Sequence, residues 1–197
     1  MKKSMLIMLA LATFLSGIST AAYAIGSQPY INLQFGYGER DTGNISGLQQ
    51  NTRSGFAYRI AVGYLFASSP YFRFGPEVGY LGVPDNQYSD NVNYDGEAAD
   101  LLLNIVFQNE TPWYLMFKGG VAYVTQRLTD TAGSRSTERR ILPEAAVAIG
   151  YRISKHFSLA ISANRIFGRN GLDGNSSNLN NGVASITTYM GELTFAF

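Results

Sequence analysis

The chain has 197 residues, and its near-neutral formal charge of +1 argues against nucleic acid as a partner. It contains no cysteine, which excludes thiol chemistry, a disulfide scaffold and a lipid anchor on a cysteine. Charged residues make up 15% of the chain, below the roughly 25% of ordinary soluble proteins, while aromatic residues reach 13% and glycines number 21.

The first residues have the pattern of a secretory signal peptide. A short cationic start precedes an apolar stretch over residues 5–15, which is too short for a membrane-spanning helix. Small residues follow, and Ala22 and Ala24 fit the A-x-A cleavage pattern. We therefore expect residues 1–24 to be removed and residues 25–197 to form a single domain.

Eight later segments alternate apolar and polar residues with the two-residue period of a β-strand. They cover residues 30–37, 54–66, 71–81, 98–107, 113–126, 140–151, 157–167 and 183–197. Crossing a bilayer as a tilted strand takes about 9–11 residues. The segments show no convincing apolar stripe at helical spacing, so the fold class is predicted to be all-β.

The connections between these segments alternate between long and short. Long polar connections cover 38–53, 82–97, 127–139 and 168–182, and short ones cover 67–70, 108–112 and 152–156. Transmembrane barrels combine long extracellular loops with short periplasmic turns. The pattern predicts an eight-stranded antiparallel up-and-down transmembrane β-barrel.

The two faces of each segment differ in a way that indicates their direction. In the second segment, Phe56, Ile60 and Val62 lie on one face, while Ala57 and Gly63 lie on the other. A soluble lipocalin-like barrel would need a polar, water-exposed outer face, whereas glycine and alanine with isolated charges suit the cramped interior of a narrow barrel. Aromatic residues also gather toward both ends of the apolar face, as they do at membrane interfaces. We expect the apolar face to meet lipid.

Three stretches resemble the broad family of small eight-stranded outer-membrane barrels, which includes the transmembrane domain of the outer membrane protein A type and the X-type adhesion barrels. The stretches are RFGPEVGY at 73–80, GYRISKHFSLAIS at 150–162 and the closing GELTFAF at 191–197. The resemblance implies this fold and a cell outer membrane location, with outer-membrane lipids and lipopolysaccharide as partners. In the closing strand, Phe195 and Phe197 look like the signal that the barrel assembly machinery reads.

Strand parity places eight charged residues on the lumen side. They are Arg59, Arg73, Glu77, Asp100, Lys118, Arg140, Glu144 and Glu192. Unpaired charges in a narrow lumen are costly, so we expect pairing, with Arg59 next to Glu77 and Lys118 next to Glu144 on neighbouring strands. We interpret the set as a plug that fills the lumen; a small-solute pore gated by the same network is the alternative.

A short His-x-Ser motif raises an enzymatic alternative. His156 and Ser158 resemble the pair of the lipid A deacylase barrel, in which histidine activates serine as a nucleophile. His156, however, falls at a short turn, which should be periplasmic, whereas the acyl chains of lipid A lie in the outer leaflet. No acidic residue follows at a spacing that would orient the histidine. We expect no catalytic residue, metal site or cofactor.

Pro76 and Pro143 fall inside predicted strands, where proline removes a ladder hydrogen bond. We expect a bulge or a missing bond at each. Taken together, the sequence predicts a non-enzymatic barrel with a structural or surface-interaction, adhesin-like role through its extracellular loops, which could meet a host or cell-surface ligand.

Overall fold

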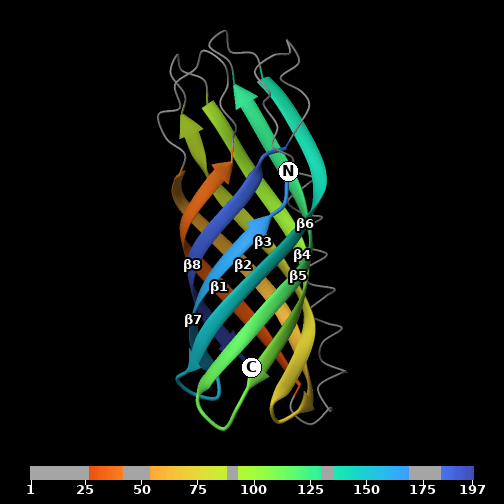
Figure 1. The fold of residues 1–197 in the computed structure, drawn as a ribbon, viewed down its shortest axis with the longest axis vertical. Coiled ribbons are helices and arrows are strands. Elements are labelled where there is room, and N and C mark those ends of the chain that lie inside the picture. Colours follow the sequence, from red (N-terminus) through yellow and green to blue (C-terminus); the bar gives the residue numbers. More distant parts are fainter. Residues whose placement is uncertain (1–26, 42–53, 88–92, 130–134, 169–182) are drawn as a thin grey trace.

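The computed structural model describes residues 27–41, 54–87, 93–129, 135–168 and 183–197, which form one closed β-barrel (Figure 1). Its eight strands are β1 (Gln28–Asp41), β2 (Ser54–Ser69), β3 (Phe72–Gln87), β4 (Asn93–Gln108), β5 (Trp113–Thr129), β6 (Arg135–Arg152), β7 (Phe157–Ile166) and β8 (Ser185–Ala196). The predicted eight-stranded all-β fold is confirmed.

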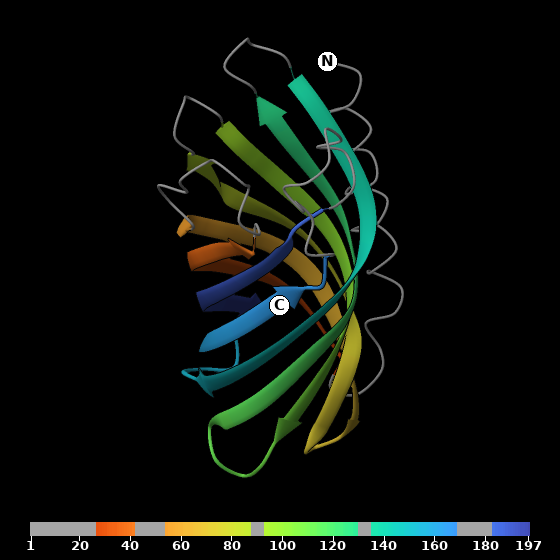
Figure 2. The same cartoon turned by 45° about the horizontal axis from the view of Figure 1, so that its top comes forward.

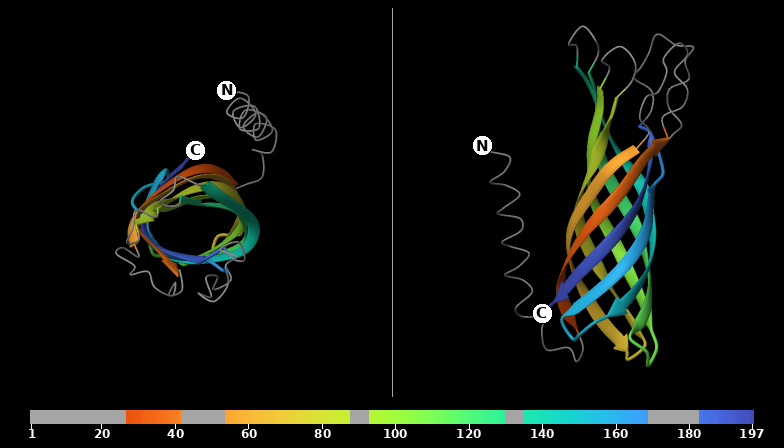
Figure 3. Two further views of the ribbon diagram at one scale, coloured as in Figure 1. Left: turned by 90° about the horizontal axis from the view of Figure 1, so that it is seen from above. Right: turned by 90° about the vertical axis from the view of Figure 1, so that its left-hand side faces the viewer.

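Each strand pairs antiparallel with its neighbours in the sequence, and β8 returns to β1 to close the ring (Figure 3). The closing ladder runs from Tyr30 opposite Ala196 to Asp41 opposite Ser185. Closure leaves no free sheet edge along this seam, so the backbone groups of β1 and β8 satisfy one another. In the part of the chain described, no helix has the length and apolarity needed to cross a membrane.

The apolar face of the strands lies on the outside of the barrel. Ile60, Leu103 and Ile161 are 49%, 49% and 68% exposed, whereas Arg59 and Asp100 on the opposite face are 2% and 3% exposed. A water-soluble barrel would bury the aliphatic face instead. The expected outward orientation of the apolar face is confirmed.

Aromatic side chains ring both ends of this outer face. At the short-turn end, Trp113 packs edge-on against Tyr151 with ring centroids 5.1 Å apart, and Phe72 lies 5.3 Å from Phe107. At the loop end, exposed rings include those of Tyr37, Phe56, Tyr58, Tyr80, Tyr123, Phe167 and Tyr189. Amphipathic rings are most stable at the depth of lipid headgroups, so the two rings of aromatic residues mark the two membrane surfaces.

Two of the expected long loops are largely strand. The β3–β4 ladder continues to Gln87 opposite Asn93, and the β5–β6 ladder continues to Thr129 opposite Arg135. The sequence boundary was wrong because apolar alternation stops where lipid stops, whereas backbone pairing continues into water. As a result, β3 to β6 reach further at the loop end than the other strands (Figure 2).

The two prolines occupy places where a missing N–H group is tolerated. At Pro76, the β2–β3 ladder lacks the pairs between Gly63–Glu77 and Phe66–Phe74, with the same register on both sides. Pro143 keeps its place opposite Val121 and accepts a bond from Phe167 N at 2.9 Å, just where β6 continues beyond the end of β7. The expected interruption is present at Pro76. Pro143 shows no bulge: it lies directly beyond the last β6–β7 pair, where Phe167 N donates to its carbonyl and only the reciprocal N–H bond is missing.

Candidate functional site

A buried ionic cluster, here called the central layer, crosses the lumen at mid-barrel. Arg59 on β2 has Nη2 2.8 Å from Oε1 of Glu77 on β3, and its Nε donates to Oδ2 of Asp100 on β4 at 2.8 Å. These three side chains are 1% exposed or less. Gly79 makes the space: a Cβ there would lie 2.5 Å from Arg59 Nη2 and 2.7 Å from Asp100 Oδ1. One planar guanidinium thus serves carboxylates on two neighbouring strands.

Lys118 on β5 extends the central layer across the lumen. Its Nζ lies 3.2 Å from Glu77 Oε1 and 3.6 Å from Oε2 of Glu192 on β8. Asn32 on β1 donates to the same Glu192 oxygen at 2.9 Å. Lys118 therefore connects β5 with β8, which are separated by β6 and β7 around the ring, through the interior.

Neutral polar side chains complete the central layer, and the sequence analysis did not identify them. The Tyr30 hydroxyl donates to Glu77 Oε2 at 2.8 Å, and the Asn104 amide donates to the same oxygen at 3.0 Å. The Asn164 amide donates to Oε1 of Glu144 at 2.6 Å. The signal that could have found them is the same parity that marks the inward charges, applied to amides and hydroxyls as well.

Two of the eight charged residues predicted for the lumen network, Arg140 and Arg73, lie outside the central layer. The predicted pair of Lys118 with Glu144 is replaced by other ion pairs. Arg140 lies at the loop end, half-exposed, with Nε 3.7 Å from Glu138. It is solvated because β7 ends opposite Glu144, which leaves the β6 segment beyond that point without a neighbour on that side. Arg73 lies at the short-turn end. The ion pairs of Lys118 involve Glu77 and Glu192, not Glu144. Parity predicts which face a residue occupies but not its depth along the barrel.

Apolar side chains close the lumen on both sides of the central layer. The loop-side cluster consists of Ala57, Leu81, Val83, Ala98, Ala122, Val124, Ile166, Val183, Ile186 and Met190. The turn-side cluster consists of Val106, Met116, Ala148 and Ala160, with Leu65 and Tyr114 packed against it. Beyond the loop-side cluster, Gln126 exchanges two hydrogen bonds with the backbone of Ala184, at 3.2 and 3.3 Å. The described lumen is a filled core.

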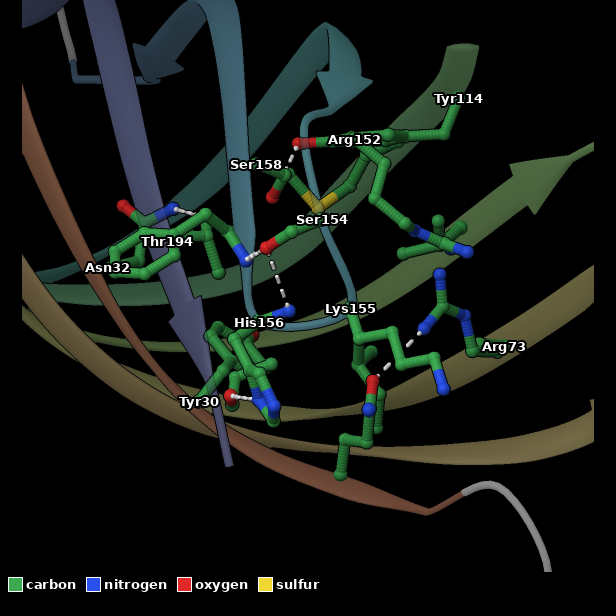
Figure 4. A pocket seen from close by; sticks show the side chains of 16 residues that line it. Tyr30, Asn32, Arg73, Tyr114, Arg152, Ser154, Lys155, His156, Ser158 and Thr194 are labelled. Atoms are coloured by element: carbon green, nitrogen blue, oxygen red, sulfur yellow. Dashed lines mark hydrogen bonds between the residues drawn. The ribbon is translucent and has the colours of Figure 1, made fainter. Parts of the chain in front are cut away.

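A cavity of about 60 Å³ opens at the short-turn mouth of the barrel, and we call it the mouth cavity (Figure 4). Its apolar floor includes Val106 and Met116 of the turn-side cluster. Its walls and rim carry the cationic or titratable side chains of Arg73, Arg152, Lys155 and His156. Most of the accessible surface of the mouth cavity is apolar, and the charged groups stand at its edge, at the end where turns are short.

The His156–Ser158 motif does not form a nucleophilic pair among the described contacts. His156 Nδ1 lies 2.9 Å from the carbonyl oxygen of Ala196, and its ring packs against Phe195 with centroids 6.1 Å apart. Ser158 Oγ instead accepts a bond from the Tyr114 hydroxyl at 3.4 Å. The geometry favours a histidine that fixes the β7 turn to the end of β8 over a catalytic base.

Phe195 and Phe197 lie at the short-turn end of the barrel, and their ring centroids are 4.9 Å apart. Phe195 also packs against Phe157 at 4.9 Å, and Phe197 N donates to Pro29 O at 3.0 Å. These contacts tie the last strand to β7 and β1. Reading by the assembly machinery stays a prediction, and the expected cleavage residues Ala22 and Ala24 lie outside the described residues.

A sequence comparison with protein families finds one match that covers most of the chain. The family model described as "Outer membrane protein beta-barrel domain" matches residues 8–187. No curated protein sequence matches the chain.

Solved structures with the same fold have low sequence identity to the chain. Neisserial surface protein A (NspA) is 14% identical with a TM-score of 0.60, covering 87% of this chain and 99% of that chain. The attachment invasion locus protein Ail of Yersinia pestis, in complex with the heparin analogue sucrose octasulfate, is 11% identical with a TM-score of 0.53 (86% and 99% covered). The N-terminal barrel of Pseudomonas aeruginosa OprF is 11% identical with a TM-score of 0.53 (87% and 99% covered). At such identities the likeness establishes the fold.

Proposed function

Because the chain belongs to the outer membrane protein β-barrel family, we propose that it is a non-enzymatic outer-membrane protein with a plugged lumen and a surface-interaction role. The family and the fold place the protein in the outer membrane of a Gram-negative cell. The finer role, an adhesin-like one carried by the extracellular end, is the proposal.

The main support for a plugged lumen is the order in which charged and apolar side chains follow one another along the barrel axis. The central layer, with Arg59 and Glu77 at its core, lies between two apolar clusters. An eight-stranded barrel has an interior just wide enough for side chains to fill. A solute that crossed the lumen would have to separate ion pairs that are withdrawn from water, and breaking a buried pair costs about 3–5 kcal/mol.

The extended part of β3 to β6 supports the surface role. Beyond the aromatic ring at the loop end, Arg127 lies 3.1 Å from Glu97 and 3.8 Å from Asp95, with about half of each side chain exposed. A rigid, polar platform of this kind suits presentation of loops to lipopolysaccharide or to a ligand on another cell. Among structures of the same fold, Ail is solved in complex with a heparin analogue, which supports a search for ligands of this protein.

The pore alternative is tested by conductance. The purified barrel, reconstituted in planar bilayers beside a general porin, should give no stable single-channel steps. Steps that disappear when Arg59 and Lys118 are replaced by methionine would overturn the plugged lumen and favour a gated pore.

The surface role is tested by a binding screen on whole cells. Cells that display the intact barrel are compared with cells in which residues 42–53, 88–92, 130–134 and 169–182 are replaced by short Gly-Ser linkers, with the turn 153–156 replaced as the control. Loss of binding to lipopolysaccharide or host cells only in the loop variant supports the proposal. Equal binding by all three would overturn it, and an altered acylation pattern of lipid A in mass spectra would favour the enzyme.

A further inference from the structure

The mouth cavity brings two arginines together around one neutral acceptor. Arg73 on β3 donates to Gln28 Oε1 at 3.3 Å and to Gln108 Oε1 at 2.8 Å. The Arg152 guanidinium, at the end of β6, donates to the same Gln108 oxygen. An amide oxygen carries no formal charge, so it leaves the two positive charges uncompensated.

No carboxylate of the described side chains pairs with the cations of the mouth cavity. Among the described residues, the ion pairs within 4.0 Å do not include Arg73, Arg152 or Lys155. Glu110, in the turn between β4 and β5, contacts the Tyr71 hydroxyl at 3.5 Å. Two cations near one another repel, most strongly where water is partly excluded, so a bound anion would stabilise this arrangement.

Further hydrogen-bond donors line the mouth cavity beside the two arginines. The Tyr114 ring lies against Gly150, where a Cβ would come within 2.1 Å of its Cζ. Its hydroxyl bonds to Ser158 Oγ at 3.4 Å, which leaves two hydroxyl groups side by side in the lining. Lys155 lies at the rim of the same cavity. The site thus combines a close-packed phenol on β5 with charged side chains from two strands, β3 and β6, and from a turn.

We propose that the mouth cavity binds a phosphate group that reaches it from the periplasm, with the guanidiniums of Arg73 and Arg152 as its principal ligands. A guanidinium presents five N–H donors in a planar fork that matches phosphate geometry. A phosphomonoester carries about −1.5 to −2 charge at neutral pH, which balances two arginines better than a carboxylate does. A cavity of about 60 Å³ has room for roughly four or five water-sized atoms, the size of one phosphate group. This inference is independent of the surface role proposed for the opposite end.

The phosphate could belong to a water-borne molecule or to the headgroup of an inner-leaflet lipid. The mouth cavity lies within the ring of strands, behind the lipid-facing side chains, and this position favours the water-borne source. An experiment with both kinds of phosphate separates the two.

The test uses the folded protein isolated in uncharged maltoside micelles, titrated calorimetrically with sodium phosphate at constant ionic strength. Binding should weaken at least about tenfold in Arg73→Gln and in Arg152→Gln and stay unchanged in Arg139→Gln, an exposed arginine at the loop end that serves as the matched control. Acetate at the same ionic strength should not compete. Absence of phosphate binding, or binding that all variants retain, would overturn the proposal.

Competition then identifies the source. Displacement by glycerol 3-phosphate alone assigns a water-borne phosphomonoester, and displacement by a short-chain phosphatidylglycerol alone assigns a lipid headgroup. If a glutamine variant does not fold, arginine side-chain NMR of the unmodified protein replaces it. The Nε–Hε signals of Arg73 and Arg152, but not that of Arg139, should shift with phosphate, and shifts that are equal for all three would contradict the site.

Discussion

Arg59 illustrates how much of the interior depends on one side chain. Its guanidinium contacts Glu77 and Asp100 from two strands, and all three groups are withdrawn from water. Burial of an ion pair is not in itself stabilising, but removal of one partner leaves charges without compensation. At this scale the lumen behaves as the polar core of a soluble protein does.

Replacing Arg59 by methionine should lower the free energy of unfolding by about 3–5 kcal/mol, because two buried carboxylates would lose their common partner. The change is measured by urea unfolding in lipid vesicles, followed by the fluorescence of Trp113. Arg127→Met, with a side chain 46% exposed, should cost about 1 kcal/mol or less. Equal costs for the two substitutions would contradict the importance of the buried cation.

Gly79→Ala should destabilise the barrel by roughly 1–3 kcal/mol, because the added methyl group would overlap Arg59 Nη2 and Asp100 Oδ1. Gly119→Ala is the matched control, since a Cβ at Gly119 would meet nothing within 4 Å. The same unfolding assay compares them. A larger decrease in the free energy of unfolding for Gly119→Ala than for Gly79→Ala would show that glycine is needed for the strand backbone and not for space in the lumen.

At the scale of elements, the strands differ in what surrounds them. β7 ends at Ile166, whereas β6 on one side continues well beyond it toward the loop end. Pro143 lies at this transition, and Arg140 lies beyond it in water. The end of one strand therefore explains both an allowed proline and a lumen-side charge that is not buried.

Pro143→Val should change the unfolding free energy by no more than about 1 kcal/mol, because the valine N–H could add only a single bond, to Phe167, at the end of the β6–β7 ladder. Ala145→Pro, two residues along β6 and paired with Gly119 and Arg165, should cost roughly 1–3 kcal/mol, because it removes a hydrogen bond from inside the ladder and leaves a carbonyl without its donor. Both side chains are exposed on the outer face, so the comparison isolates the backbone. Equal tolerance of proline at the two positions would contradict this account of the ladder.

The whole molecule has two unlike ends joined by a filled barrel. The loop end rises as a polar sheet of β3 to β6, and the turn end carries the cationic mouth cavity and the aromatic cluster around Phe195. The oily outer face between them requires a bilayer. Because the lumen is closed by apolar clusters, the two ends can act independently.

Single cysteines placed at Ile60, Leu103 or Ile161 should resist a water-soluble maleimide in intact vesicles, because these positions face hydrocarbon. The chain has no native cysteine to interfere. A cysteine at Arg139, exposed in the extended part of β6, should react fully. Rapid labelling at the three aliphatic positions would mean that the apolar face is not in lipid.

The sequence alone determined the number of strands, their antiparallel order and the direction of their faces, because a two-residue period and the contrast of apolar and small residues are local properties. It also identified most of the charged residues of the central layer, since parity places Arg59, Glu77 and Lys118 on one face. Tertiary structure decided the rest. Shear and unequal strand lengths set the depth of each side chain along the barrel. As a result, Arg140 lies in water, Arg73 lies at the mouth cavity, and Lys118 contacts Glu192 across the lumen. No pattern within a single strand contains that information, because depth and partners depend on how all eight strands are staggered.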